Sequence, residues 1–142
     1  MKPAIAATLI ALSLAACGQD EGEMTRTPSP ADAKVFFIEP ADGATVTTPV
    51  TVKFGIEGME VAPAGTEKPN AGHHHLLVDT ALDDYDAPIP ADDKHKHFGK
   101  GQTETQIELT PGEHTLQLIL GDQNHIPHDP VVESESITVT VE

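Results

Sequence analysis

Short runs in which apolar and polar residues alternate recur along the chain from residue 34 onward. Every second residue is apolar in Val50–Ile56, and the same holds for Ile137–Val141. Successive side chains of a strand point to opposite sides, so this period of two predicts strands with one buried face. No stretch of ten residues in this part shows the 3.6-residue period of an amphipathic helix. The pattern therefore predicts an all-β domain.

Seven such runs are separated by turn-forming residues. Pro40 and Gly43 follow the first run, and Pro111 and Gly112 separate the fifth from the sixth. The expected strands are Val35–Ile38, Val50–Glu57, His73–Asp79, Lys94–Phe98, Thr103–Leu109, His114–Leu120 and Ile137–Val141. Seven short strands with turns between them predict an immunoglobulin-like antiparallel β-sandwich spanning residues 34–142.

The N-terminal part of the chain has a different composition. Lys2 precedes the apolar run Ala4–Leu14, which is too short to span a bilayer, so residues 1–16 are expected to be a cleaved secretory signal. The sequence Leu-Ala-Ala-Cys ending at Cys17 resembles the lipobox of bacterial lipoproteins. This resemblance implies that Cys17 is lipidated and becomes the mature N-terminus, which would anchor the protein to a membrane.

Residues 17–33 are rich in Gly, Asp, Glu, Ser, Thr and Pro and show no apolar period, so we expect a flexible tether. Cys17 is the only cysteine, which leaves no thiol for a disulfide, a nucleophile or a metal ligand. Gly18 follows it in place of Asp, which resembles the sorting pattern of outer-membrane lipoproteins. We therefore expect a periplasm-facing protein of the cell envelope, on the outer rather than the inner membrane.

Charge and motif content exclude two classes of function. The net charge is −15, with 8 Lys and Arg against 23 Asp and Glu, which argues against a nucleic-acid partner and favours a cationic one. The chain lacks a Gly-x-Ser-x-Gly motif, and the only serines of the predicted domain are Ser134 and Ser136. With no free cysteine either, we expect no enzyme.

The chain contains 8 histidines, and most of them are expected at one end of the sandwich. Because strand direction alternates, the start of the third strand, the end of the fourth and the loop before the last strand lie at the same end. Imidazole is the commonest metal ligand and is largely neutral at pH 7. The predicted ligands are His73, His75, His97, His125 and His128, and two further candidates are His74 and Met59.

Four histidines also have structural interpretations. His74 shares its strand face with Leu76 and Val78, so a buried core histidine is as consistent with the pattern as a ligand. His95 and His97 alternate with Lys94 and Lys96, as on a solvated edge. His114 lies at the opposite end and is expected to replace the corner tyrosine that ties down a strand in many such sandwiches.

Several imidazoles, no thiolate and a thioether suit copper, with zinc as the second choice. Calcium prefers oxygen ligands and is disfavoured. The predicted function is therefore metal binding in delivery, uptake or tolerance. The alternative is a non-catalytic module that binds another envelope protein through the same histidine-bearing loops.

Five separated motifs resemble a known bacterial family, the domain-of-unknown-function family 4399. They begin at Val35, Gly58, Gly72, His97 and Leu120, and the resemblance covers Val35 to Val141. It implies a secreted β-sandwich module and places function at the residues within the motifs, namely Met59, His73, His74, His75, His97, Gly99, Gln102, His125 and His128.

Overall fold

The computed structural model describes residues 25–142, so the predicted signal segment and Cys17 lie outside the described residues. This part of the chain contains nine strands: β1 (Lys34–Glu39), β2 (Thr45–Val46), β3 (Val50–Glu57), β4 (Glu60–Val61), β5 (Ala71–Val78), β6 (His95–His97), β7 (Glu104–Ile107), β8 (Gly112–Gly121) and β9 (Ile137–Val141). Residues 25–142 contain no helix that is long and apolar enough to cross a membrane.

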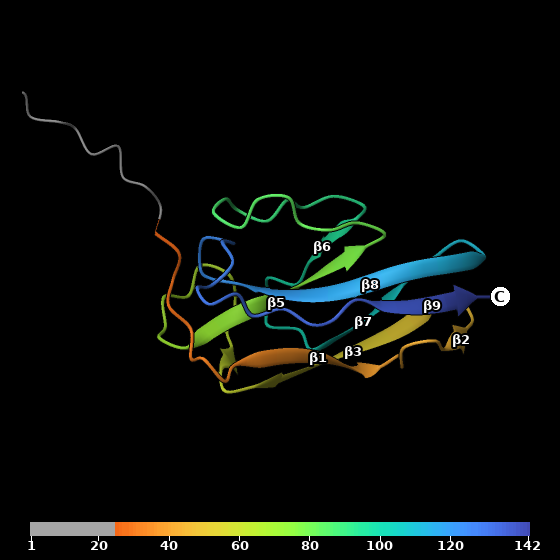
Figure 1. Cartoon of the computed structure of the whole chain (residues 1–142), viewed down its shortest axis with the longest axis horizontal. Helices are drawn as coiled ribbons and strands as arrows, with labels where there is room; N and C mark the ends of the chain where they lie inside the picture. The colour runs from red at the N-terminus through yellow and green to blue at the C-terminus, as the bar shows by residue number, and fades with distance from the viewer. Residues whose placement is uncertain (1–24) are drawn as a thin grey trace, which may run out of the picture.

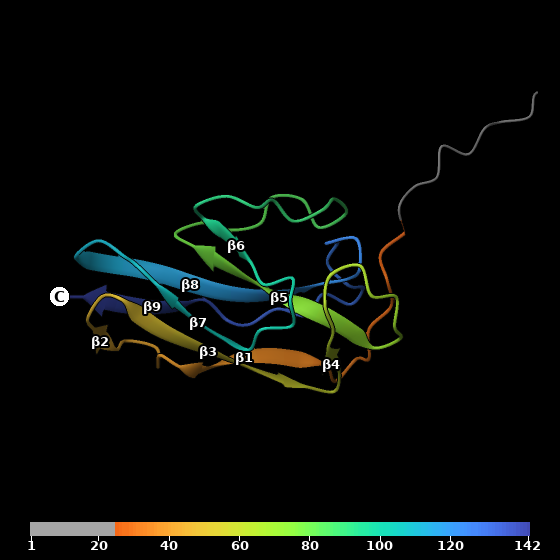
Figure 2. The same cartoon turned by 180° about the vertical axis from the view of Figure 1, so that it is seen from behind.

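The strands form two sheets that face each other (Figures 1 and 2). One sheet has the order β1-β3-β7, and the other has the order β2-β9-β8-β5-β4, with β6 paired to β5. The predicted all-β sandwich is confirmed, and its seven expected strands correspond to β1, β3 and β5 to β9. The two-residue strands β2 and β4 were not predicted, because both are too short to show a period and form only by parallel pairing, with β9 and β5 respectively.

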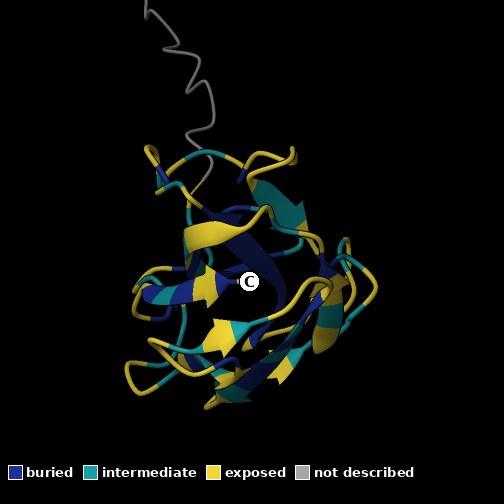
Figure 3. Ribbon diagram, turned by 90° about the vertical axis from the view of Figure 1, so that its right-hand side faces the viewer, coloured by how far each residue is buried: buried dark blue, intermediate teal, exposed yellow. Residues whose placement is uncertain are grey.

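The main core lies between the two sheets, as the alternation predicts. Val52 and Phe54 of β3 face Leu116 and Leu118 of β8, and all four are buried. Figure 3 shows the buried residues gathered inside the sandwich and the exposed residues at its rim. Burying one such side chain contributes about 1.5–3 kcal/mol, so this cluster supplies much of the driving force for folding.

Strand β5 is buried on both faces along its whole length. Its inner face, with Leu76 and Val78, belongs to the main core. Its outer face, with Leu77, is covered by Leu82 and Ile89 from the long loop that follows β5 and forms a second hydrophobic cluster. This loop runs over the outer side of the six-stranded sheet in Figure 1. His73 and His75 share the face of Leu77 and therefore lie between the sheet and its covering loops.

The N-terminal described residues pack against the domain. The Arg26 guanidinium donates a hydrogen bond to the carbonyl oxygen of Pro127 (3.2 Å), and Thr27 Oγ1 donates one to Asp122 Oδ2 (2.6 Å). Arg26 and Thr27, which lie within the segment 17–33 that was expected to be a tether, thus make ordered contacts with the domain. The side chains of Arg26 and Thr27 donate hydrogen bonds to acceptors in the 121–130 loop. Local composition does not predict hydrogen bonds between segments so far apart in the sequence.

Candidate metal centre

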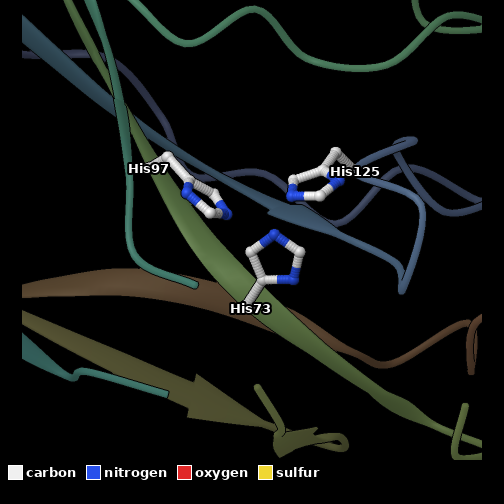
Figure 4. Close-up of side chains that lie close together, drawn as sticks. All are labelled: His73, His97 and His125. Atoms are coloured by element: carbon white, nitrogen blue, oxygen red, sulfur yellow. The ribbon is translucent and has the colours of Figure 1, made fainter. Parts of the chain in front are cut away.

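Three histidines from three separate segments converge on the outer face of the six-stranded sheet. His73 lies on β5, His97 ends β6, and His125 lies in the loop after β8. One nitrogen from each ring can be chosen so that all three lie within 4.8 Å of one another. In Figure 4 the three rings are turned toward a common space. We call this group together with His75 the histidine cluster.

Strand pairing brings these residues together. The antiparallel register of β5 and β6 places His75 opposite His97, and that of β5 and β8 places His73 opposite Gly121. His125 follows Gly121 by four residues, so the loop returns its ring over β5. The ring centroids of His73 lie 5.0 Å from those of both His97 and His125.

His75 is the innermost member of the cluster. It is fully buried, and its Nε2 lies 2.9 Å from Nε2 of His73, at hydrogen-bonding distance. Its ring centroid is 5.1 Å from that of His97 and 6.0 Å from that of His125. The cluster therefore consists of four imidazoles within contact distance of at least two others.

Two glycines make room for these rings. A Cβ atom at Gly121 would lie 2.9 Å from Nε2 of His75, and one at Gly99 would lie 2.3 Å from Cε1 of His97. Carbon atoms do not approach other heavy atoms so closely without displacement, so a side chain at either position would push a ring of the cluster out of place. The family resemblance singled out Gly99, whereas Gly121 was not predicted.

The loop that carries His125 is held by the buried carboxylate of Asp122. Asp122 Oδ1 accepts hydrogen bonds from the backbone N–H groups of Asn124 (2.8 Å) and Ile126 (3.0 Å). His125 adopts a left-handed backbone conformation with φ of 68°, which is uncommon outside glycine. Asp122 thus closes the turn that presents the His125 ring. The sequence signal for this role is an Asp two residues before Asn124 in a Gly-Asp-x-Asn pattern.

The local environment lowers the pKa values of three members of the cluster, His73, His75 and His97, and so favours their neutral forms. Burial, followed by the neighbouring rings of His125 and His97, lowers the pKa of His73 to about 4. Burial and the His73 ring lower the pKa of His75 to about 2. Burial and the His125 ring also lower the pKa of His97. Neutral imidazoles retain a free lone pair, which is the form that binds a metal ion.

The structure does not bring His74 or Met59 to the cluster. His74 lies on the opposite face of β5, where its ring contacts that of Phe54 with a centroid distance of 5.0 Å. Neither of its ring nitrogens has a hydrogen-bonding partner within residues 25–142, and burial lowers its pKa to about 4. Met59 belongs to the main core on that same face. The core interpretation of His74 thus agrees with the structure.

His128 also lies away from the cluster. Its ring contacts Gly72, whose Cβ position is 2.9 Å from Cε1, and Gly72 shares its face of β5 with His74. Its Nε2 donates a hydrogen bond to the carbonyl oxygen of Ala71 (3.3 Å). Pro127, between His125 and His128, is buried and forms a bridge with Gly121, so the chain passes across the edge of the sheet between the two rings.

The remaining two histidines have carboxylate partners. His95 Nδ1 lies 2.8 Å from Oδ1 of Asp92 on the far end of β6. His114 lies at the start of β8, where Nε2 donates to the carbonyl oxygen of Thr110 (2.8 Å) and Nδ1 to Oδ2 of Asp79 (2.7 Å). The bond to a carbonyl four residues upstream is the one expected of a corner tyrosine, so that interpretation of His114 is confirmed.

Comparison with known proteins identifies a family. The model of one protein family, described as a domain of unknown function (DUF4399), matches residues 52–142. This range includes the whole histidine cluster and agrees with the resemblance of the sequence motifs. No curated protein and no solved structure matches the chain.

Proposed function

The chain belongs to the DUF4399 family, and we propose that it is a metal-binding lipoprotein of the bacterial cell envelope. Its histidine cluster would hold a transition-metal ion, copper rather than zinc, for delivery, uptake or tolerance. The observation that carries this proposal is the convergence of His73, His97 and His125, whose ring nitrogens lie within 4.8 Å of one another. Three ligands on one ion, with bonds of about 2.0–2.1 Å, need nitrogens roughly 3.3 Å apart, so small ring rotations suffice.

The chemistry of the cluster supports copper as the first choice. All its donors are imidazole nitrogens, and among divalent ions such sites bind copper most tightly, with zinc next in suitability. The net charge of −15 attracts cations to the surface. Oxygen-preferring ions such as calcium are disfavoured because the cluster contains no carboxylate ligand within residues 25–142.

We propose that the site binds its ion without catalysing a reaction. Ser134, one of the two serines of the predicted domain, accepts a hydrogen bond from the N–H of Leu118 and donates one to the carbonyl oxygen of Glu135, a structural arrangement. A nucleophile that is already engaged on both sides is not available for attack. Metal-dependent turnover of an ester or of carbon dioxide by the purified protein would contradict this part of the proposal.

Calorimetry with Cu²⁺ and Zn²⁺ at pH 7 tests the metal-binding function. The mature chain is purified without an affinity tag as a Cys17→Ser variant, so that it is free of lipid. We expect one ion per chain. His73→Ala should weaken binding at least about 100-fold, because it removes a ligand of the site. His95→Ala is the matched control and should bind as the parent does, since His95 pairs with Asp92 outside the cluster.

Absence of binding of either metal by the folded parent protein would exclude the metal-binding function. In that case the alternative role, a module that binds another envelope protein, would be tested by copurification. A partner retained equally by a variant without His73, His75, His125 and His128 would then favour a surface outside the cluster.

The lipid anchor is a separate part of the proposal and rests on the Leu-Ala-Ala-Cys motif at Cys17. We expect the native protein in the membrane fraction, the outer membrane in particular, and metabolic labelling with a fatty acid. Cys17→Ser should lose the label and appear in the soluble fraction. Retention of the variant in the membrane, or native protein without a lipid, would contradict the anchor without affecting the metal-binding function.

A further inference from the structure

We infer that His75 is the fourth ligand of the site, so that the ion is held by four imidazole nitrogens and no sulfur. This donor set suits a divalent ion, Cu²⁺ or Zn²⁺, and disfavours Cu⁺. The inference rests on the proposed metal-binding function and specifies the chemical class of its cargo.

The hydrogen bonding of His75 supports this role. His75 is fully buried, its Nε2 lies 2.9 Å from Nε2 of His73, and its Nδ1 has no partner within residues 25–142. The ring nitrogen of His73 that lies farther from the backbone points between His97 and His125 in Figure 4. Within the described residues, the hydrogen-bonding partner of His75 is therefore the His73 nitrogen that points between His97 and His125.

Metal binding changes what this pair requires. The ion takes the lone pair of His73 Nε2, which then neither donates nor accepts a hydrogen bond. If His75 kept a proton on Nε2, its N–H would face a cation and would have no acceptor. A buried polar group without a partner costs about 1–3 kcal/mol, and more next to a like charge. With the proton on Nδ1, that N–H also lacks a partner within residues 25–142, but a lone pair instead of an N–H then faces the ion from Nε2, and coordination compensates for the lost hydrogen bond.

Packing prevents His75 from turning away. Nε2 of His75 lies against the backbone of Gly121, 2.9 Å from the position that a Cβ atom would take there, and His75 has no exposed surface. Its ring centroid is 4.7 Å from that of His73 and 5.1 Å from that of His97. A ring enclosed in this way must face the bound ion.

Residues 25–142 offer the ion no sulfur ligand. Met59 is the only methionine among residues 25–142, and it belongs to the main core on the opposite face of β5. Cuprous copper favours thioether and thiolate ligands, whereas imidazole suits divalent copper and zinc. The expectation that Met59 supplies a soft ligand is thus replaced by an all-nitrogen site.

Pulsed electron paramagnetic resonance of the Cu²⁺-loaded mature chain with Cys17→Ser tests the inference. The parent should show four coordinated imidazoles, and reduction with ascorbate should release the copper. His75→Phe, which keeps a ring of similar shape, and His75→Gln, which keeps a neutral polar group, should each show three imidazoles and at least tenfold weaker binding. Circular dichroism verifies the fold of each variant.

Three coordinated imidazoles in the parent protein would overturn the inference even if neither variant folds. Folded His75 variants that bind copper with the parent affinity and give the parent spectrum would also overturn it. If the parent protein retained copper after reduction with ascorbate, the preference for a divalent ion would be wrong. These outcomes leave the proposed function intact as long as His73→Ala abolishes binding. Failure of the parent protein to bind Cu²⁺ or Zn²⁺ would instead remove the proposed function together with the inference.

Discussion

Gly121 shows how a single residue without a side chain shapes the site. It ends β8 opposite His73, and its Cβ position is 2.9 Å from Nε2 of His75 and 3.4 Å from Cα of His125. The ring of His75 occupies the volume that any other residue would fill. The position is therefore constrained by packing rather than by backbone conformation.

We predict that Gly121→Ala weakens metal binding at least tenfold. The added methyl group displaces the His75 ring, and overpacking of this kind also costs about 1–3 kcal/mol of folding stability. Calorimetry and chemical denaturation measure the two effects. Gly43→Ala is the matched control: Gly43 has φ of 79° and nothing within 4 Å of its Cβ position, so it should lose stability through strain but keep the parent affinity. Parent affinity in folded Gly121→Ala would show that the ring is not confined as described.

At the scale of elements, His114 joins three parts of the fold. Its ring connects the start of β8 to Asp79, just after β5, and to Thr110 in the preceding turn. The hydrogen bonds to Asp79 and Thr110 raise the pKa of His114. Burial alone would raise the pKa of Asp79, but the hydrogen bonds from His114 and the Thr115 N–H outweigh it and lower the pKa.

The direction of the His114 shift determines its effect on stability. A histidine whose pKa is raised by folding contributes stability that is fully present below its unfolded pKa of about 6.5 and is lost as the pH rises through the folded value. The lowered pKa of Asp79 has the opposite consequence, because its contribution is present above about 3.9 and is lost as the pH falls. The connection is therefore strongest in mildly acidic solution.

We predict that the contribution of His114 to the free energy of unfolding decreases as the pH rises from 6 to 9, and it is measured as the difference between the parent and a His114 variant because the lowered pKa values of His73, His74 and His75 change the stability of both proteins in the opposite direction. His114→Ala should lose about 1–3 kcal/mol at pH 6, the contribution of two hydrogen bonds, and less at pH 9. His114→Tyr should restore the bond to Thr110 without this pH dependence. Urea denaturation at several pH values measures the effect. An equal loss in the alanine variant at both pH values would contradict the titration of His114 in this range.

At the scale of the whole molecule, the histidine cluster lies at the end of the sandwich where the described chain begins. Arg26 and Thr27 bind the 121–130 loop, which also carries His125. Figure 1 shows this loop and the first described residues at the same end, opposite the C-terminus. The segment that follows the proposed anchor thus helps to hold the loop of the metal centre.

The alternation of apolar residues was sufficient to predict the sandwich, because period and turn residues are local properties. The same reasoning placed His73 and His97 together, since strand direction follows from strand order. It did not separate His125 from His128, which lie three residues apart in one loop but on different sides of the sheet edge. Which way each ring points depends on Asp122 and Pro127, and Asp122 is itself bound by Thr27, which is distant in sequence.

The sequence by itself determined seven of the nine strands within residues 25–142, the inner faces of β3, β8 and β9, and the set of histidines from which a metal site could be built. Only the tertiary structure decided which of them meet. It buries β5 on both faces: Leu82 and Ile89 of the loop after Val78 cover Leu77, and the rings of His97 and His125 pack against His73 and His75. On the inner face, His74 contacts Phe54 and Met59 belongs to the main core. The alternation of apolar residues indicates on which face of a strand a side chain lies. It does not indicate which distant segments pack against that face, because this depends on long-range tertiary contacts.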